Sequence, residues 1–166
     1  MIEWFESVFG TLPKELFAAL ISMVPVIELR GGLPYALYHD ISIWVAAPLC
    51  IAANLLPVPF ILWFITPLFN AMKKTKLLRP LAEKLEARAM KKKDKIEKGY
   101  FWGLLCFVGI PLPGTGAWTG ALIASMLDIP KKKSLPAIAL GVCLAAVIMT
   151  VLFLFFKELF MALFPA

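Results

Sequence analysis

Two stretches of this chain, residues 25–48 and 113–136, repeat one pattern, and each carries a break where a membrane helix would be continuous. Proline, glycine and aspartate recur in both, and these residues mark backbone breaks rather than hydrophobic filler. Paired interrupted segments in the two halves of a membrane protein are typical of a transport site. The repeat therefore predicts two related units that share one site. At an offset of 88 residues, six of the 24 paired positions are identical: Pro25/Pro113, Gly32/Gly120, Ala36/Ala124, Asp40/Asp128, Ile41/Ile129 and Pro48/Pro136.

The composition is that of a membrane protein. Of the 166 residues, 61% are apolar and 17% are charged, which excludes an ordinary soluble domain and leaves room for one unit. We expect a single membrane domain, with a first repeat at 1–72, a basic connector at 73–99 and a second repeat at 100–166. Of the 17 Lys and Arg residues, 14 lie within 73–98 and 131–133. This clustering is typical of membrane orientation and not of nucleic-acid binding.

Each repeat begins with two short apolar pieces. In the first, residues 16–27 and 33–38 flank the sequence ELRGG, and in the second, residues 100–110 and 117–127 flank PLPGTG. A helix of 12 residues is about 18 Å long, whereas the hydrocarbon core of a bilayer is about 30 Å thick. We therefore expect each repeat to start with a half-helix, a turn and a second half-helix.

Each pair of short pieces is followed by a run long enough to span a membrane, residues 43–72 and 135–156. Four complete crossings would place 131–133 on the face opposite the connector. Hairpins that dip in and return leave both basic clusters on one side, which the positive-inside rule makes cytoplasmic. We therefore predict an all-α membrane protein, an inverted repeat of two units, each a re-entrant helical hairpin followed by a transmembrane helix. A short interfacial helix is expected at the acidic N-terminus.

Glu28 and Arg30 are the two formal charges deep within an apolar hairpin, in the sequence PVIELRGGLP. An unpaired charge at this depth costs several kcal/mol, so such residues usually face a cavity or each other. Both are site candidates, and the alternative is that they cap a turn near the water surface. Gly31 and Gly32 are expected to form the tight reversal and to let a ligand approach the backbone.

The second break is uncharged but offers free backbone groups and polar side chains. Short helices beginning at Ala117 and Leu33 would aim N–H donors and a positive dipole end inward, where an anion would be stabilised. Because guanidinium pairs well with either group, Arg30 favours phosphate or carboxylate as the ligand. Glu28 would either orient Arg30 or carry a proton. The candidates from this break are Pro113, Gly114, Thr115, Gly116, Trp118 and Thr119.

The other polar residues have either a functional or a structural interpretation in the case of Asn54, and a structural one in the case of the repeated aspartates. Asn54, in the first long run, would reach the cavity or satisfy a carbonyl freed by Pro57. The repeated Asp40 and Asp128 predict N-caps for the long helices that follow. The chain has no GxSxG, HExxH or Walker sequence, and one His cannot build a multi-His metal site. We expect no enzymatic activity, no cofactor and no metal.

Together, PVIELRGGLP, PLPGTGAWTG and the basic connector resemble the small multidrug-export family of prokaryotic membrane proteins, over nearly the whole chain. More distantly, the chain is similar to the DedA/VTT superfamily, in which paired re-entrant hairpins and spans handle lipids such as undecaprenyl phosphate. DedA proteins typically place acidic residues in the first hairpin and arginines in the second, whereas here Glu28 and Arg30 share the first. The resemblance implies a multi-pass protein of a prokaryotic inner (plasma) membrane.

The expected function is a secondary transporter or flippase for an anionic, phosphate-bearing small molecule or lipid, coupled to protons or ions. One alternative is an exporter of cationic drugs with Glu28 as counter-charge, and another is a non-transporting scaffold that organises lipids. Expected partners are membrane lipids, the substrate and a second copy of the chain, because broken backbone must be shielded from lipid. The row of small residues Ala137, Gly141 and Ala145 would permit close helix contact in such a homodimer.

Overall fold

The computed structural model of the protein describes residues 12–74, 99–112 and 114–163, which form seven helices and no strand. This confirms the predicted all-α class. The predicted interfacial helix at the N-terminus and most of the basic connector lie outside the described residues. The helices are α2 (Lys14–Met23), α3 (Glu28–Tyr38), α4 (Ile43–Leu55), α5 (Pro57–Lys74), α8 (Tyr100–Gly109), α9 (Ala117–Met126) and α10 (Lys131–Leu163).

Both predicted long helices are present. Leu56, between α4 and α5, keeps helical angles (φ −55°, ψ −45°), so the two helices follow one path. The segments Ile43–Phe64, of 22 residues, and Lys131–Lys157, of 27 residues, are long and apolar enough to cross a membrane. At about 1.5 Å per residue, each exceeds the thickness of about 30 Å that a hydrocarbon core presents.

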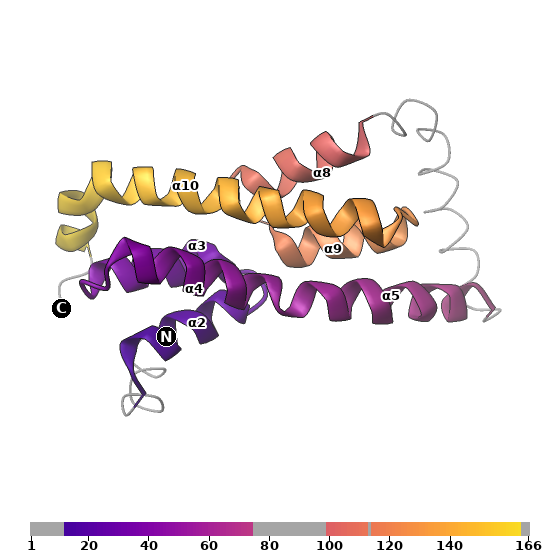
Figure 1. Ribbon diagram of the computed structural model, residues 1–166, viewed down its shortest axis with the longest axis horizontal. Coiled ribbons are helices and arrows are strands. Elements are labelled where there is room, and N and C mark those ends of the chain that lie inside the picture. Colours follow the sequence, from indigo (N-terminus) through magenta and orange to yellow (C-terminus); the bar gives the residue numbers. More distant parts are fainter. Residues whose placement is uncertain (1–11, 75–98, 113, 164–166) are drawn as a thin grey trace.

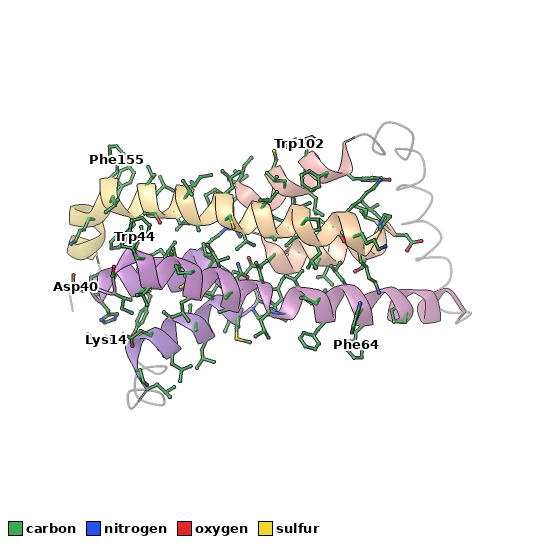
Figure 2. The ribbon with its side chains drawn as sticks, viewed as in Figure 1. Lys14, Asp40, Trp44, Phe64, Trp102 and Phe155 are labelled. Carbon is green, nitrogen blue, oxygen red and sulfur yellow. The ribbon has the colours of Figure 1, made fainter. Side chains whose placement is uncertain are left out.

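The short helices lie in two pairs at opposite ends of the molecule. The α4–α5 path packs against α10 and runs in the opposite direction (Figure 1). α2 and α3 pack on each other and on α4, whereas α8 packs on α10 and α9 packs on α5. Lys14, at the start of α2, and Asp40, just after α3, lie at the same end (Figure 2). α8 and α9 likewise reach inward from the other end and return, so the two turns meet in the middle (Figure 1).

The repeated aspartates end the short helices; they do not begin the long ones, so the N-cap prediction is wrong. Asp40 has a left-handed φ of 60° directly after α3. Its N–H donates to the Leu37 carbonyl at 3.3 Å, and the Ile41 N–H donates to the Ala36 carbonyl at 3.0 Å. These two bonds define a Schellman cap, in which a left-handed residue satisfies the last carbonyls of a helix. The second copy repeats the cap with Asp128 (φ 54°), Ile129 and Ala124.

The repeated glycines also share one role, close packing within each helix pair. A Cβ at Gly32 would overlap the Ser22 hydroxyl of α2, and a Cβ at Gly120 would lie 2.6 Å from Val108 of α8. Real Cβ atoms do not approach other atoms so closely, so both positions require glycine unless the neighbour moves. The identical residues of the repeat therefore fix how each short pair ends and packs.

The surface carries large apolar side chains at both ends. Trp44 is 86% exposed and Phe155 is 82% exposed at one end, and Trp102 is 66% exposed toward the other (Figure 2). Aromatic residues gather at both interfaces of a membrane protein, where the ring meets lipid and headgroups together. Exposed aromatics of this kind are typical of a surface that contacts lipid.

The small-residue row on α10 is used inside the monomer. Ala137 is fully buried and Ala145 is 5% exposed. A Cβ at Gly141 would lie 2.8 Å from the Cβ of Val108 and 2.9 Å from the Leu105 carbonyl, both in α8. The row therefore brings α8 close to α10, and the prediction that it forms a dimer contact is wrong. The homodimer itself stays a prediction.

Candidate functional site

The first break lies earlier than predicted, between α2 and α3 at residues 24–27. Val26 (φ 77°) and Glu28 (φ 53°) adopt the left-handed conformation, which costs a non-glycine residue about 1–3 kcal/mol. Gly31 and Gly32 do not form the reversal; they lie within α3, which begins at Glu28 and not at Leu33. Gly32 packs on α2 instead of turning the chain, and Glu28 is held by N–H groups outside its own helix.

The second break, between α8 and α9, is non-helical as predicted. Gly114 has a φ of 80°, a conformation that glycine adopts freely. The Thr115 hydroxyl lies 2.8 Å from the Ile110 carbonyl and 2.9 Å from the Leu112 carbonyl, and it accepts from the Leu112 N–H at 3.3 Å. Thr115 thus ties the loop to the end of α8. Pro113 lies outside the described residues.

Glu28 caps the first turn of α9. Its Oε2 accepts from the Ala117 N–H at 3.1 Å and its Oε1 from the Trp118 N–H at 3.0 Å, while the side chain is only 4% exposed. A carboxylate is stabilised here by the free N–H groups and by the positive end of the helix dipole. At the start of α9, where the sequence predicted that a ligand anion would bind, the structure places the chain's own carboxylate.

Arg30 reaches across to the second break. Its Nη2 donates to the Thr115 hydroxyl at 2.9 Å and to the Ile110 carbonyl at 3.3 Å. Its Nε is buried and has no hydrogen-bond partner in the structure. Thr115, rather than Glu28, therefore orients the guanidinium, and at least one N–H of Arg30 is left without an acceptor.

Trp118 makes the reciprocal contact. Its indole Nε1 donates at 3.1 Å to the carbonyl of Met23, the last residue of α2. Arg30 contacts the carbonyl of Ile110, the residue that follows α8. Arg30 and Trp118 occupy equivalent positions at the offset of 88. Each repeat thus sends one donor to the end of the first short helix of the other repeat.

Glu28 and Gly116 are also equivalent at this offset. A Cβ at Gly116 would overlap the Glu28 carboxylate, so only a residue without a side chain leaves room for the acid. Where positions 28 and 116 meet, there is room for the Glu28 side chain but not for a second side chain at position 116. This explains why one copy carries an acid and the other carries glycine.

The structure shows no hydrogen bond that joins the remaining candidates to the group formed by Glu28, Arg30, Thr115 and Trp118. Asn54 is 2% exposed in α4, and its Oδ1 has no hydrogen-bond partner in the structure. Thr119 lies half-buried in α9, one residue beyond Trp118. Among the described residues, no group of three or more His, Cys, Asp or Glu side chains could hold a metal ion.

Two backbone acceptors, the carbonyls of Met23 and Ile110, belong to the site and escaped the sequence interpretation. At the offset of 88, Met23 pairs with Pro111 and Ile110 pairs with Ser22, so the repeat points to neither carbonyl. It does point to the side chains that reach them. Pairing positions 28 with 116 and 30 with 118 places the non-identical residues of the two breaks opposite each other. The six identical positions determine the shared backbone geometry of the two repeats, and the residues that differ supply the polar groups of the site.

Comparison with known proteins identifies the family. No curated protein and no solved structure matches the chain, and the more distant resemblance to DedA proteins stays a prediction. One family model matches residues 28–148, a range that begins at Glu28 and contains the second break and the core of both long helices. This range covers well over half of the 166 residues. The chain therefore belongs to the family described as "Putative small multi-drug export protein".

Proposed function

We propose that this protein is a secondary transporter that moves a small anion, bearing a phosphate or a carboxylate, past Arg30 in the middle of a membrane. The family description indicates export across a membrane, and two helices of the chain are able to cross one. The observation that carries the proposal is the Arg30 guanidinium, which has a buried Nε without an acceptor between two helix breaks. A charge at such depth usually serves a substrate pathway.

The topology we propose is two re-entrant hairpins in inverted orientation. Each pair of short helices begins and ends at its own end of the molecule, and the long helices run in opposite directions (Figure 1). The last turns of α5 and the first of α10, with Lys131, lie at one end, which the positive-inside rule makes cytoplasmic. In a cysteine-free background, single cysteines at positions 92 and 132 should then label from the same side. Labelling from opposite sides would disprove this topology.

The hydrogen bonds favour an anion over a cation as substrate. Both carboxylate oxygens of Glu28 already accept from α9, whereas Arg30 retains an unused donor. A cationic drug at Glu28 would also meet the positive charge of Arg30 two residues away, which disfavours it. Glu28 then balances Arg30 while the site is empty, and an incoming anion takes over that role.

A second candidate, export of cationic drugs, rests on the family description and on the buried acid Glu28. An experiment that separates the two measures transport currents in proteoliposomes on a solid-supported membrane, with inorganic phosphate, acetate and ethidium as probes. We expect currents with an anion and not with ethidium. Currents with ethidium alone would establish the second candidate instead.

Arg30→Ala tests the role of the guanidinium in the same assay. The variant should lose the anion current while it stays folded, because Glu28 still accepts from the Ala117 and Trp118 N–H groups and Thr115 still contacts the Ile110 carbonyl without Arg30. Its melting temperature should fall only by what the two Arg30 hydrogen bonds contribute. Lys14→Gln, an exposed charge at the start of α2, is the matched control and should transport normally. An unchanged current in Arg30→Ala would remove Arg30 from the pathway.

A further inference from the structure

A groove lies between α8 and α9, away from Glu28 and Arg30. Its volume is about 320 Å³, which is at the lower end of the range for ligand pockets. The walls come from α8 and the residue before it, from the last part of α9, and from the residue after the α9 cap. The starts of α8 and α10 lie at the same end of the molecule, and the groove opens there (Figure 1). Its lining is almost entirely apolar: Gly99, Tyr100, Gly103, Leu104, Phe107, Ile123, Leu127 and Ile129.

Gly103 keeps this groove open. A Cβ at Gly103 would meet no atom within 4 Å, whereas a Cβ at Gly109, Gly120 or Gly141 would lie 2.6–2.8 Å from a neighbouring side chain. Glycine inside a helix destabilises it by about 0.5–1 kcal/mol relative to alanine. At the other three positions close helix packing explains the glycine. At Gly103 no neighbouring atom explains the glycine. The space that a larger side chain would fill at this position belongs to the groove.

A basic cluster, Lys131–Lys133, starts α10 at the same end of the molecule as the groove (Figure 1). It begins two residues after Ile129, which forms part of the groove wall, and all three lysines are exposed. Lys131 is held over the ring of Trp63 at 5.9 Å, in α5 rather than in a wall of the groove, so Lys132 and Lys133 are the lysines free of this contact. Lys133 starts the row that continues through Ala137 to Gly141, which abuts α8. Asp128 is the acidic residue nearest in the sequence, so the cluster keeps a positive charge.

We propose that the groove binds one anionic phospholipid, with an acyl chain between α8 and α9 and the phosphate at Lys131–Lys133. The apolar walls suit a hydrocarbon chain, and clustered lysines at a membrane surface attract anionic headgroups. Tyr100 lines the groove and Trp102 is exposed beside it, which places this level of α8 at the interface. The groove is separate from the central site, so the proposal stands whether or not an anion passes Arg30.

Native mass spectrometry of the full-length protein with added lipid tests this proposal. Dioleoyl phosphatidylglycerol should remain bound as one retained molecule, and dioleoyl phosphatidylcholine should be retained about tenfold less because it lacks net charge. Inorganic phosphate at the same concentration should not displace the lipid. Equal retention of both lipids, or displacement by phosphate, would overturn the proposal.

Two variants remove the two halves of the site. Gly103→Phe should fill the groove without a clash at its Cβ, and it should reduce phosphatidylglycerol retention about tenfold at an unchanged melting temperature. Replacing Lys131, Lys132 and Lys133 by Gln should abolish the preference for the anionic lipid. Lys14→Gln/Lys157→Gln removes two charges at the other end and should bind as the wild type does. If Gly103→Phe is unstable, the triple lysine variant decides alone, and wild-type lipid preference in it would refute the proposal.

Discussion

The pair α2–α3 and the pair α8–α9 share one frame and differ in their chemistry. Both second helices end in the same left-handed aspartate cap, at Asp40 and Asp128. The first pair supplies a carboxylate and a guanidinium, and the second supplies a glycine and an indole at the equivalent positions. The residues that are repeated determine the backbone caps and the close packing within each pair. The residues that differ at matching positions make the contacts between the two pairs.

Each pair is completed by the other. Without Glu28, α9 would begin with two N–H groups that no side chain caps, since Gly116 has none. Without Trp118, the Met23 carbonyl at the end of α2 would lose the indole donor. Hydrogen bonds to charged groups contribute about 1.5–3 kcal/mol each. The two repeats are therefore expected to unfold together, and variants at the contact should reveal the coupling.

Gly116→Ala should reduce the stability of the protein more than any other variant at the contact between the two repeats. Its backbone angles (φ −159°, ψ −172°) suit any residue, so only the new methyl group matters, and it overlaps the Glu28 carboxylate. The displaced acid would lose both N–H donors while it stays buried. We expect a loss of about 3–5 kcal/mol, typical of stranding a buried charge, measured as a lower melting temperature in detergent.

The control for this variant is a double-mutant cycle. With Glu28→Ala already present, Gly116→Ala has no carboxylate to displace and should add little further loss. Gly103→Ala, where the methyl group meets open space, should leave the melting temperature unchanged or higher. Additive losses in the cycle would show that the two positions do not share one space.

Glu28→Gln should have a smaller effect than Gly116→Ala. The amide oxygen can accept one of the two N–H donors, but the amide NH₂ would face the other, so one buried donor at Ala117 or Trp118 is left unsatisfied. We expect a loss of about 1–3 kcal/mol in the free energy of unfolding. Glu15→Gln, an exposed acid on α2, is the matched control. Wild-type stability in Glu28→Gln would mean that the cap does not hold α9.

The sequence predicted the elements of the fold well because their signals are local. Apolar length placed the long helices, and PLPGTG placed the second break. The first break was misplaced because Val26 adopts a φ of 77°, which no propensity of valine indicates. The candidate residues were named from the sequence and their role in binding stays a prediction, whereas their pairing was not predicted. Whether Glu28 faces Arg30 or α9 depends on contacts between residues 89 and 90 positions apart, which one sequence does not reveal.

Trp118→Phe tests the reciprocal half of the contact. The phenyl ring keeps most of the packing but lacks the N–H that donates to the Met23 carbonyl at 3.1 Å. One neutral hydrogen bond contributes about 1 kcal/mol, so a modest drop in melting temperature is expected. Trp102→Phe, on the exposed face of α8, is the matched control. If both variants melt alike, the indole bond does not contribute to joining the repeats.

The smallest effects should come from the shared caps, and they should be equal in both copies. Asp40 and Asp128 have φ values of 60° and 54°, a conformation that glycine adopts without strain. Asp40→Gly and Asp128→Gly should therefore each be neutral or stabilising by up to about 1 kcal/mol. Asp40→Ala and Asp128→Ala should both be destabilising, because alanine keeps the Cβ and lacks the local hydrogen bonding of aspartate. Chemical denaturation of the four variants in detergent provides the measurement. If Asp→Gly stabilises the protein in one copy and destabilises it in the other, the two caps are not equivalent. The structural similarity of the repeats would then be limited to their packing glycines.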